Sequence, residues 1–76
     1  MKELVRIMAE ALVDHPEQVV VTIVEGENSV ILELKVAPDD VGKVIGKGGQ
    51  TAKAMRKILS AAATKLRKKS LLQIME

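Results

Sequence analysis

A chain of 76 residues has room for only one small domain, which excludes a two-domain enzyme with a cleft between its lobes. Phe, Tyr and Trp are absent, which excludes a nucleic-acid platform built on aromatic stacking, and the lack of cysteine excludes disulfides and thiolate chemistry. The net charge of +2 conceals a division, because residues 1–40 hold nine of the ten acids whereas residues 41–75 hold nine bases and no acid.

The basic half of the chain is expected to present a positive face. Polyanions are the usual partners of such a face, and a solvated helix surface is the alternative explanation. No apolar run is long enough to predict a membrane span, and charged residues interrupt the first segment too early for a signal peptide. We therefore expect a cytoplasmic protein that has no membrane partner.

Residues 2–14 have the spacing of an amphipathic helix. The apolar positions that recur at this spacing are Leu4, Ile7, Met8, Ala11 and Leu12. We expect a packing helix that ends at His15-Pro16, because the residue before a proline is pushed out of the helical region. His15 is interpreted as a surface cap and not as a metal ligand or a base.

Two strands are predicted next. Residues 18–24 are rich in β-branched side chains, and residues 25–28 form a turn. In residues 29–36 the apolar side chains of Val30, Leu32, Leu34 and Val36 alternate with others, so one face of this hairpin points inward.

Ala37-Pro38-Asp39-Asp40 is expected to start a short helix, with both carboxylates near its positive end. Paired acids also suggest acid/base or metal chemistry. No histidine, further acid or nucleophile is placed to complete such a set. We therefore interpret Asp39 and Asp40 as helix-capping residues, and we expect no enzyme activity, no metal site and no cofactor.

Gly46 is expected to stop the short helix, and a long helix is predicted from Gln50 to about Lys69. Its polar arc holds Lys53, Arg56, Lys57, Ser60, Thr64, Arg67 and Lys68. Residues 71–75 follow as a strand, which should lie parallel to strand 29–36 because a helical crossover joins them. The sequence predicts an α+β fold of order α-β-β-α-α-β, with three helices on one face of a mixed three-stranded sheet.

Three phosphate-binding motifs are candidates for the glycine-rich stretch 46–49. A P-loop requires Ser or Thr after Gly46-Lys47, where this chain has Gly48. A dinucleotide fingerprint begun at Gly46 requires glycine at position 51, which is Thr51, and would follow a strand. A G-x-x-G loop between two helices, Gly46-Lys47-Gly48-Gly49, fits.

Val44-Ile45-Gly46-Lys47-Gly48-Gly49, followed by a helix with Met55 and Leu59, resembles the K-homology (KH) domain signature. The element order is similar to the type II KH arrangement, and the resemblance extends over residues 1–76 as a single domain. A free-standing domain of this length resembles the small bacterial RNA-binding family KhpA. One departure is Ala52, where the KH signature more often has a larger aliphatic residue.

The resemblance implies a protein that binds single-stranded RNA, with single-stranded DNA as an alternative ligand, and that acts as an RNA chaperone or post-transcriptional regulator. In KH domains the loop clamps the backbone of about four nucleotides. The groove would lie between the glycine loop and the sheet edge with the hairpin turn. The residues implied in binding are Lys43, Val44, Ile45, Gly46, Lys47, Gly48, Gly49, Lys53, Arg56 and Lys57.

The long helix is apolar over more of its circumference than a surface helix needs. We hypothesise that Ala54, Ile58 and Ala61 help form a dimer surface, for a homodimer or for a heterodimer with a second KH protein resembling KhpB. The alternative is that these residues pack inside one monomer. A module that acts only through protein contacts on this face is the competing function.

Overall fold

The structure is a computed structural model that describes residues 1–75. Its helices are α1 (Lys2–Leu12), α2 (Val41–Ile45) and α3 (Gln50–Lys65), and its strands are β1 (Val20–Glu25), β2 (Ser29–Lys35) and β3 (Lys69–Met75). Single turns of 3-10 helix occupy η1 (Pro16–Gln18), η2 (Pro38–Asp40) and η3 (Lys47–Gly49). The predicted α-β-β-α-α-β order is therefore confirmed.

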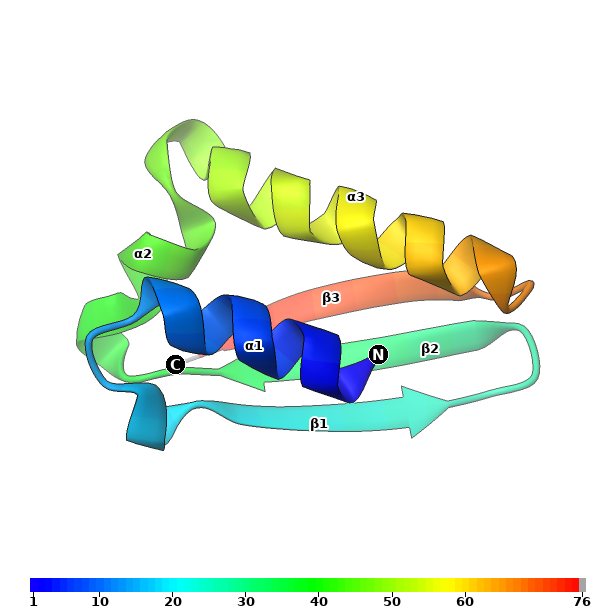
Figure 1. Cartoon of the computed structure of the whole chain (residues 1–76), viewed down its shortest axis with the longest axis horizontal. Helices are drawn as coiled ribbons and strands as arrows, with labels where there is room; N and C mark the ends of the chain where they lie inside the picture. Colours follow the sequence, from blue (N-terminus) through cyan, green and yellow to red (C-terminus); the bar gives the residue numbers. More distant parts are fainter. Residues whose placement is uncertain (76) are drawn as a thin grey trace.

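The three strands form one sheet in the order β1-β2-β3. β1 pairs with β2 antiparallel, and β2 pairs with β3 parallel, with Leu32 opposite Leu72. The helices lie on one side of this sheet (Figure 1). The α+β class and the mixed sheet were predicted correctly, and β1 and β3 are the two edges.

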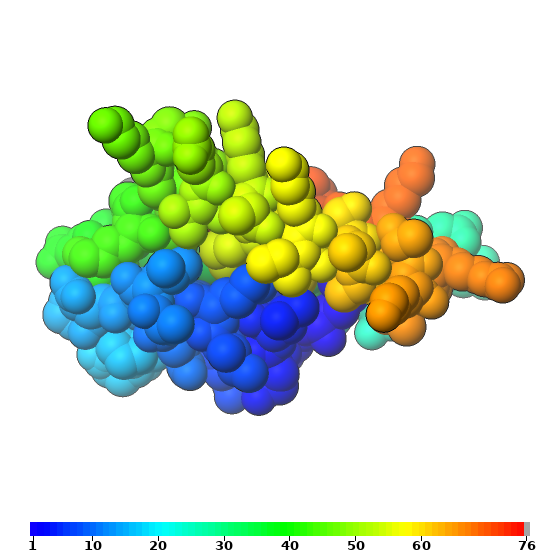
Figure 2. All heavy atoms as spheres, turned by 45° about the horizontal axis from the view of Figure 1, so that its top comes forward, coloured from blue at the N-terminus to red at the C-terminus, as the bar shows by residue number. Residues whose placement is uncertain are grey.

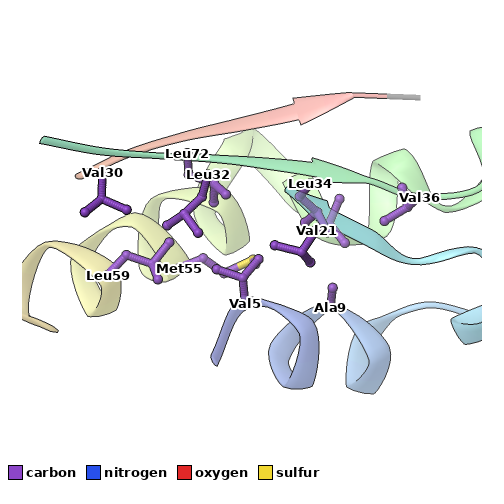
Figure 3. Close-up of a cluster of buried hydrophobic side chains, with 11 residues drawn as sticks. Val5, Ala9, Val21, Val30, Leu32, Leu34, Val36, Met55, Leu59 and Leu72 are labelled. Carbon is purple, nitrogen blue, oxygen red and sulfur yellow. The ribbon is translucent and has the colours of Figure 1, made fainter. Parts of the chain in front are cut away.

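The core lies between the sheet and the helices. Val30, Leu32, Leu34 and Val36 are buried, which confirms the alternation predicted for β2. Met55 and Leu59 of α3 face these side chains from the helical layer (Figure 3). Full burial of one such leucine contributes about 1.5–3 kcal/mol, so the aliphatic side chains provide a core without any aromatic residue.

The inward face of α1 differs from the predicted one. Val5 and Ala9 are fully buried and point toward the sheet, whereas Ile7 is 63% exposed (Figure 3). Leu4 and Met8 are only partly buried at the margin of the core. Apolar residues occupy so much of this helix that their spacing is compatible with two different inward faces. The face with the small Ala9 lets the helix lie close to the sheet.

Helix α3 ends at Lys65, four residues before its predicted end. Arg67 adopts a left-handed conformation with φ 58°, the Lys68 amide donates to the Ala63 carbonyl, and the Arg67 amide donates to Thr64. These two bonds form a Schellman motif, whose left-handed residue is usually glycine. Because arginine stands there, the sequence contains no stop signal, and β3 begins two residues earlier than predicted.

Candidate nucleic-acid interface

The glycine loop links α2 to α3 through three residues with positive φ. Gly46, Gly48 and Gly49 have φ values of 77°, 63° and 75°. The Gly46 amide closes α2 by donating to Gly42 at 2.8 Å, and the Gly49 amide donates to Gly46 at 3.1 Å. Residues with a side chain rarely adopt this conformation, so the turn depends on glycine.

The surroundings of these glycines differ. A Cβ on Gly46 would lie 2.1 Å from Thr51 Oγ1 and 2.9 Å from the Thr51 amide nitrogen, so this position is filled. A Cβ on Gly48 or Gly49 would meet nothing within 4 Å. The outer side of the loop is therefore open to the close approach of another backbone.

Val44 and Ile45 precede the loop and lie in different environments. Val44 is fully buried in the core, where it anchors α2 beneath the loop. Ile45 is 37% exposed. Of this pair, only Ile45 presents an apolar surface that a base could contact.

Three lysines among the predicted binding residues are exposed and have no acidic partner among the described residues. Lys47, Lys53 and Lys57 are exposed, and none of them forms an ion pair with another of residues 1–75. Figure 2 shows long side chains projecting from the segment that runs from the glycine loop into α3. Lys53 and Lys57, with Gln50 and Ala54, line a shallow surface depression of about 300 Å³. The positive charge therefore faces solvent beside the loop.

Lys43 is placed differently from the other lysines. Its Nζ lies 3.0 Å from Asp14 Oδ2 and 3.5 Å from Asp40 Oδ1. The hydrogen bond and the charge of Asp14 raise the pKa of Lys43, with a smaller contribution from Asp40. Lys43 thus joins α2 to the chain that follows α1, and a phosphate would have to compete with two carboxylates for it.

Asp40 is a buried connection between these two segments. Its carboxylate accepts the backbone amides of Asp14 at 3.2 Å and His15 at 3.0 Å, and it makes no capping bond to its own helix. Burial alone would raise the pKa of Asp40, but the two amide donors, with the nearby positive charge, bring it below its ordinary value. The predicted capping role is wrong for Asp40, which instead fixes the start of α2.

We expect Asp40→Asn to destabilise the protein near neutral pH, because one amide oxygen replaces two acceptors and the ion pair with Lys43 is lost. The folded pKa of Asp40 is lowered, so its contribution is complete above the unfolded pKa of about 3.9 and is lost as pH falls through the folded value. Urea unfolding should show that the difference in free energy of unfolding between wild type and variant becomes smaller below about pH 4. A difference that stays constant into acid would contradict this role.

The edge of β3 beside α3 was not predicted as part of the site. The Lys69 amide donates to the Asn28 carbonyl, and the Met75 carbonyl accepts from the Val36 amide. The backbone amides and carbonyls of the odd-numbered residues of β3 therefore point toward β2. In a parallel strand the amide and carbonyl of one residue point to one side, and those of the next residue point to the other. The amides and carbonyls of Ser70, Leu72 and Ile74 therefore point away from β2, toward the open edge. Arg56 Nη2 donates to the Leu72 carbonyl at 3.2 Å.

The hairpin turn lies far from the glycine loop, contrary to the predicted groove. It is held near the carboxyl end of α3, where Lys68 Nζ contacts Glu25 Oε2 at 2.7 Å. The loop stands at the opposite end of α3, whose 16 residues span about 24 Å (Figure 1). The edge that accompanies the loop is β3.

The predicted dimer residues lie on the flank of α3 away from Arg56. Ala54, Ile58 and Ala61 are all exposed, and Ile58 is 48% exposed. These residues do not pack inside the monomer, which was the alternative. The side chains of α1 and α3 are neighbours on this surface (Figure 2).

The described part of the chain holds neither a cluster of metal-ligating side chains nor a membrane-spanning helix. Residues 1–75 contain no group of three or more His, Asp or Glu side chains that could hold a metal ion. Within the same residues, no helix is long and apolar enough to cross a membrane.

Comparison with known proteins identifies the family. The family model described as the KH domain of KhpA/KhpB matches residues 2–74. A protein of Clostridium perfringens named RNA-binding protein KhpA is 60% identical over 97% of this chain and 99% of its own length. Relatives of the same name from Clostridium acetobutylicum and Halalkalibacterium halodurans are 54% and 51% identical, over 97% and 100% of this chain and 99% and 100% of their own lengths. The chain belongs to the KhpA/KhpB family of KH domains.

Proposed function

We propose that this protein binds single-stranded RNA and clamps the backbone of about four nucleotides with the loop Gly46-Lys47-Gly48-Gly49. The observation that carries the proposal is the open outer side of Gly48 and Gly49, where a phosphate can approach the backbone. Lys47 and Lys53 are exposed beside it and form no ion pair with another of residues 1–75. The relatives named RNA-binding proteins support the choice of RNA.

The bound strand would continue from the loop along the space between α3 and β3. Ile45 supplies an apolar contact, and the outward amides and carbonyls of β3 supply hydrogen bonds. Arg56 stands in the middle of this path. One groove of this size gives modest affinity, which suits an RNA chaperone or post-transcriptional regulator in the cytoplasm.

Salt dependence tests the electrostatic part of the clamp. The affinity for a labelled single-stranded RNA should fall with salt, with a log–log slope of about 0.7 for each contacted phosphate. Lys47→Ala should reduce this slope by about 0.7. Lys2→Ala removes an equal charge from α1 and should leave the slope unchanged. A salt-insensitive complex would contradict the proposal, and labelled single-stranded DNA in the same assay would measure selectivity for RNA.

A second proposal concerns the exposed flank of α3. Ala54 and Ala61 beside Ile58 form a small-residue surface around one large apolar side chain, which suits close helix packing. We propose that this flank pairs with a second copy or with a KhpB-like KH protein. Two grooves held together would bind RNA more tightly than one, because the second contact becomes intramolecular.

Ile58→Asp is expected to leave the fold intact, because Ile58 is 48% exposed, and to shift the protein to monomer. A charge buried in a dimer interface without a partner weakens association by several kcal/mol. Sedimentation at several concentrations would measure the shift. Val24→Asp, at an apolar residue exposed on the opposite face of the sheet, is the matched control. A monomer–dimer balance that is the same in wild type and Ile58→Asp would remove the proposal.

A further inference from the structure

Arg56 binds the backbone carbonyl of Leu72, which is the central residue of the three whose backbone groups point outward from β3. Its Nη2 donates to the Leu72 carbonyl at 3.2 Å across the space between α3 and β3. Arg56 is the seventh residue of α3, so it lies about 10 Å along the helix axis from Gly49. Arg56 therefore lies within the length of strand that a four-nucleotide groove contacts.

The contact changes the hydrogen-bonding character of the edge. Without it, Leu72 would present one donor and one acceptor, its amide and its carbonyl. With it, a guanidinium is held against the acceptor. The remaining N–H groups of Arg56 and the Leu72 amide are all donors. The centre of the groove thus presents donors and a positive charge.

Nucleobases differ in the group they offer to such a surface. Cytosine and adenine carry an exocyclic amino group, which is a donor, whereas uracil and guanine carry a carbonyl oxygen at the equivalent position. An amino group directed at Arg56 would place its hydrogens against a cation. A carbonyl oxygen would accept a charge-assisted bond instead.

We propose that Arg56 sets base preference in the groove, and that it favours uracil and guanine over cytosine and adenine at the nucleotide facing Leu72. This inference rests on the proposed function, because it needs RNA in the groove. Arg56 then acts as a specificity-determining residue, in contrast to Lys47, which would contact phosphate and would not distinguish bases.

Pentamers of uridine and of cytidine provide the sharpest test, because both bases are pyrimidines with the same sugar and phosphates. Fluorescence anisotropy with each labelled pentamer should show wild type binding the uridine pentamer about tenfold more tightly, as one charge-assisted hydrogen bond provides. Arg56→Ala removes the guanidinium and frees the Leu72 carbonyl. The ratio of the affinity for the uridine pentamer to that for the cytidine pentamer should fall to about one. The variant should bind the uridine pentamer more weakly and the cytidine pentamer equally or more tightly.

Lys53→Ala is the matched control, because it removes one charge from the same helix without touching β3. It should weaken both pentamers by the same factor and leave their ratio unchanged. If Arg56→Ala also leaves the ratio unchanged, or if wild type binds both pentamers equally, the inference is overturned and the proposed function stands. If wild type binds neither pentamer nor any longer single strand, the proposed function fails. Far-UV circular dichroism establishes that each variant is folded.

Discussion

Replacing Lys47 and Gly48 together by aspartate is expected to abolish binding to single-stranded RNA while the fold is retained. The pair places two carboxylates where the clamp would hold phosphate, so attraction becomes repulsion. Loss of the charged hydrogen bonds alone corresponds to about 3 kcal/mol, or roughly a hundredfold in affinity. Anisotropy with a labelled RNA would measure the loss.

The fold should survive because Lys47 and Gly48 are exposed and a Cβ on Gly48 meets nothing within 4 Å. Aspartate is among the residues that tolerate positive φ, and the strain should be about 1 kcal/mol. Lys2→Asp with Asn28→Asp makes the same change in net charge at exposed sites on α1 and in the hairpin turn. If this control weakens binding as much as the loop variant does, general charge and not the loop accounts for affinity.

Gly46→Ala is expected to destabilise the protein by about 3 kcal/mol or more. Two effects add at this position. The residue has φ 77°, which disfavours any side chain, and the new Cβ would lie 2.7 Å from the Thr51 Cβ and 2.9 Å from the Thr51 amide nitrogen. Rotation of the Thr51 side chain relieves only the contact with its hydroxyl. Urea unfolding followed by far-UV circular dichroism would measure the change.

Two glycines near Gly46 separate these effects. Gly49→Ala shares the positive φ but meets open space, so it should cost only about 1 kcal/mol. Gly42→Ala lies within α2, has no positive φ and meets nothing within 4 Å, so it should stabilise the protein by about 0.5–1 kcal/mol. Similar destabilisation by all three substitutions would show that the clash with Thr51 is unimportant.

The sequence predicted those features that depend on local pattern. The alternation in residues 29–36 identified the buried face of β2, because successive side chains of a strand point to opposite faces. The three glycines identified the loop between α2 and α3, because only glycine adopts positive φ freely. The order of elements then limited the fold to a mixed sheet with a parallel crossover.

Features that depend on contacts between distant residues were missed. The backbone amides that donate to the Asp40 carboxylate belong to Asp14 and His15, which lie 26 and 25 residues earlier in the chain. The contact of Arg56 with Leu72 requires knowing which residues of β3 face outward, and that follows only from the register with β2. The left-handed Arg67 gave no signal, because arginine is not a residue that favours this conformation.

The outward backbone groups of β3 have a consequence for solubility. An unpaired strand edge is a template for pairing with a strand of another chain, and proteins protect such edges with charged side chains. Here Arg56 covers the central carbonyl, and Lys69 stands exposed at the first residue of the strand. These two charges, of which only Arg56 is proposed to contact RNA, therefore deter edge-to-edge aggregation, so the edge can stay open for a nucleic acid without recruiting another sheet.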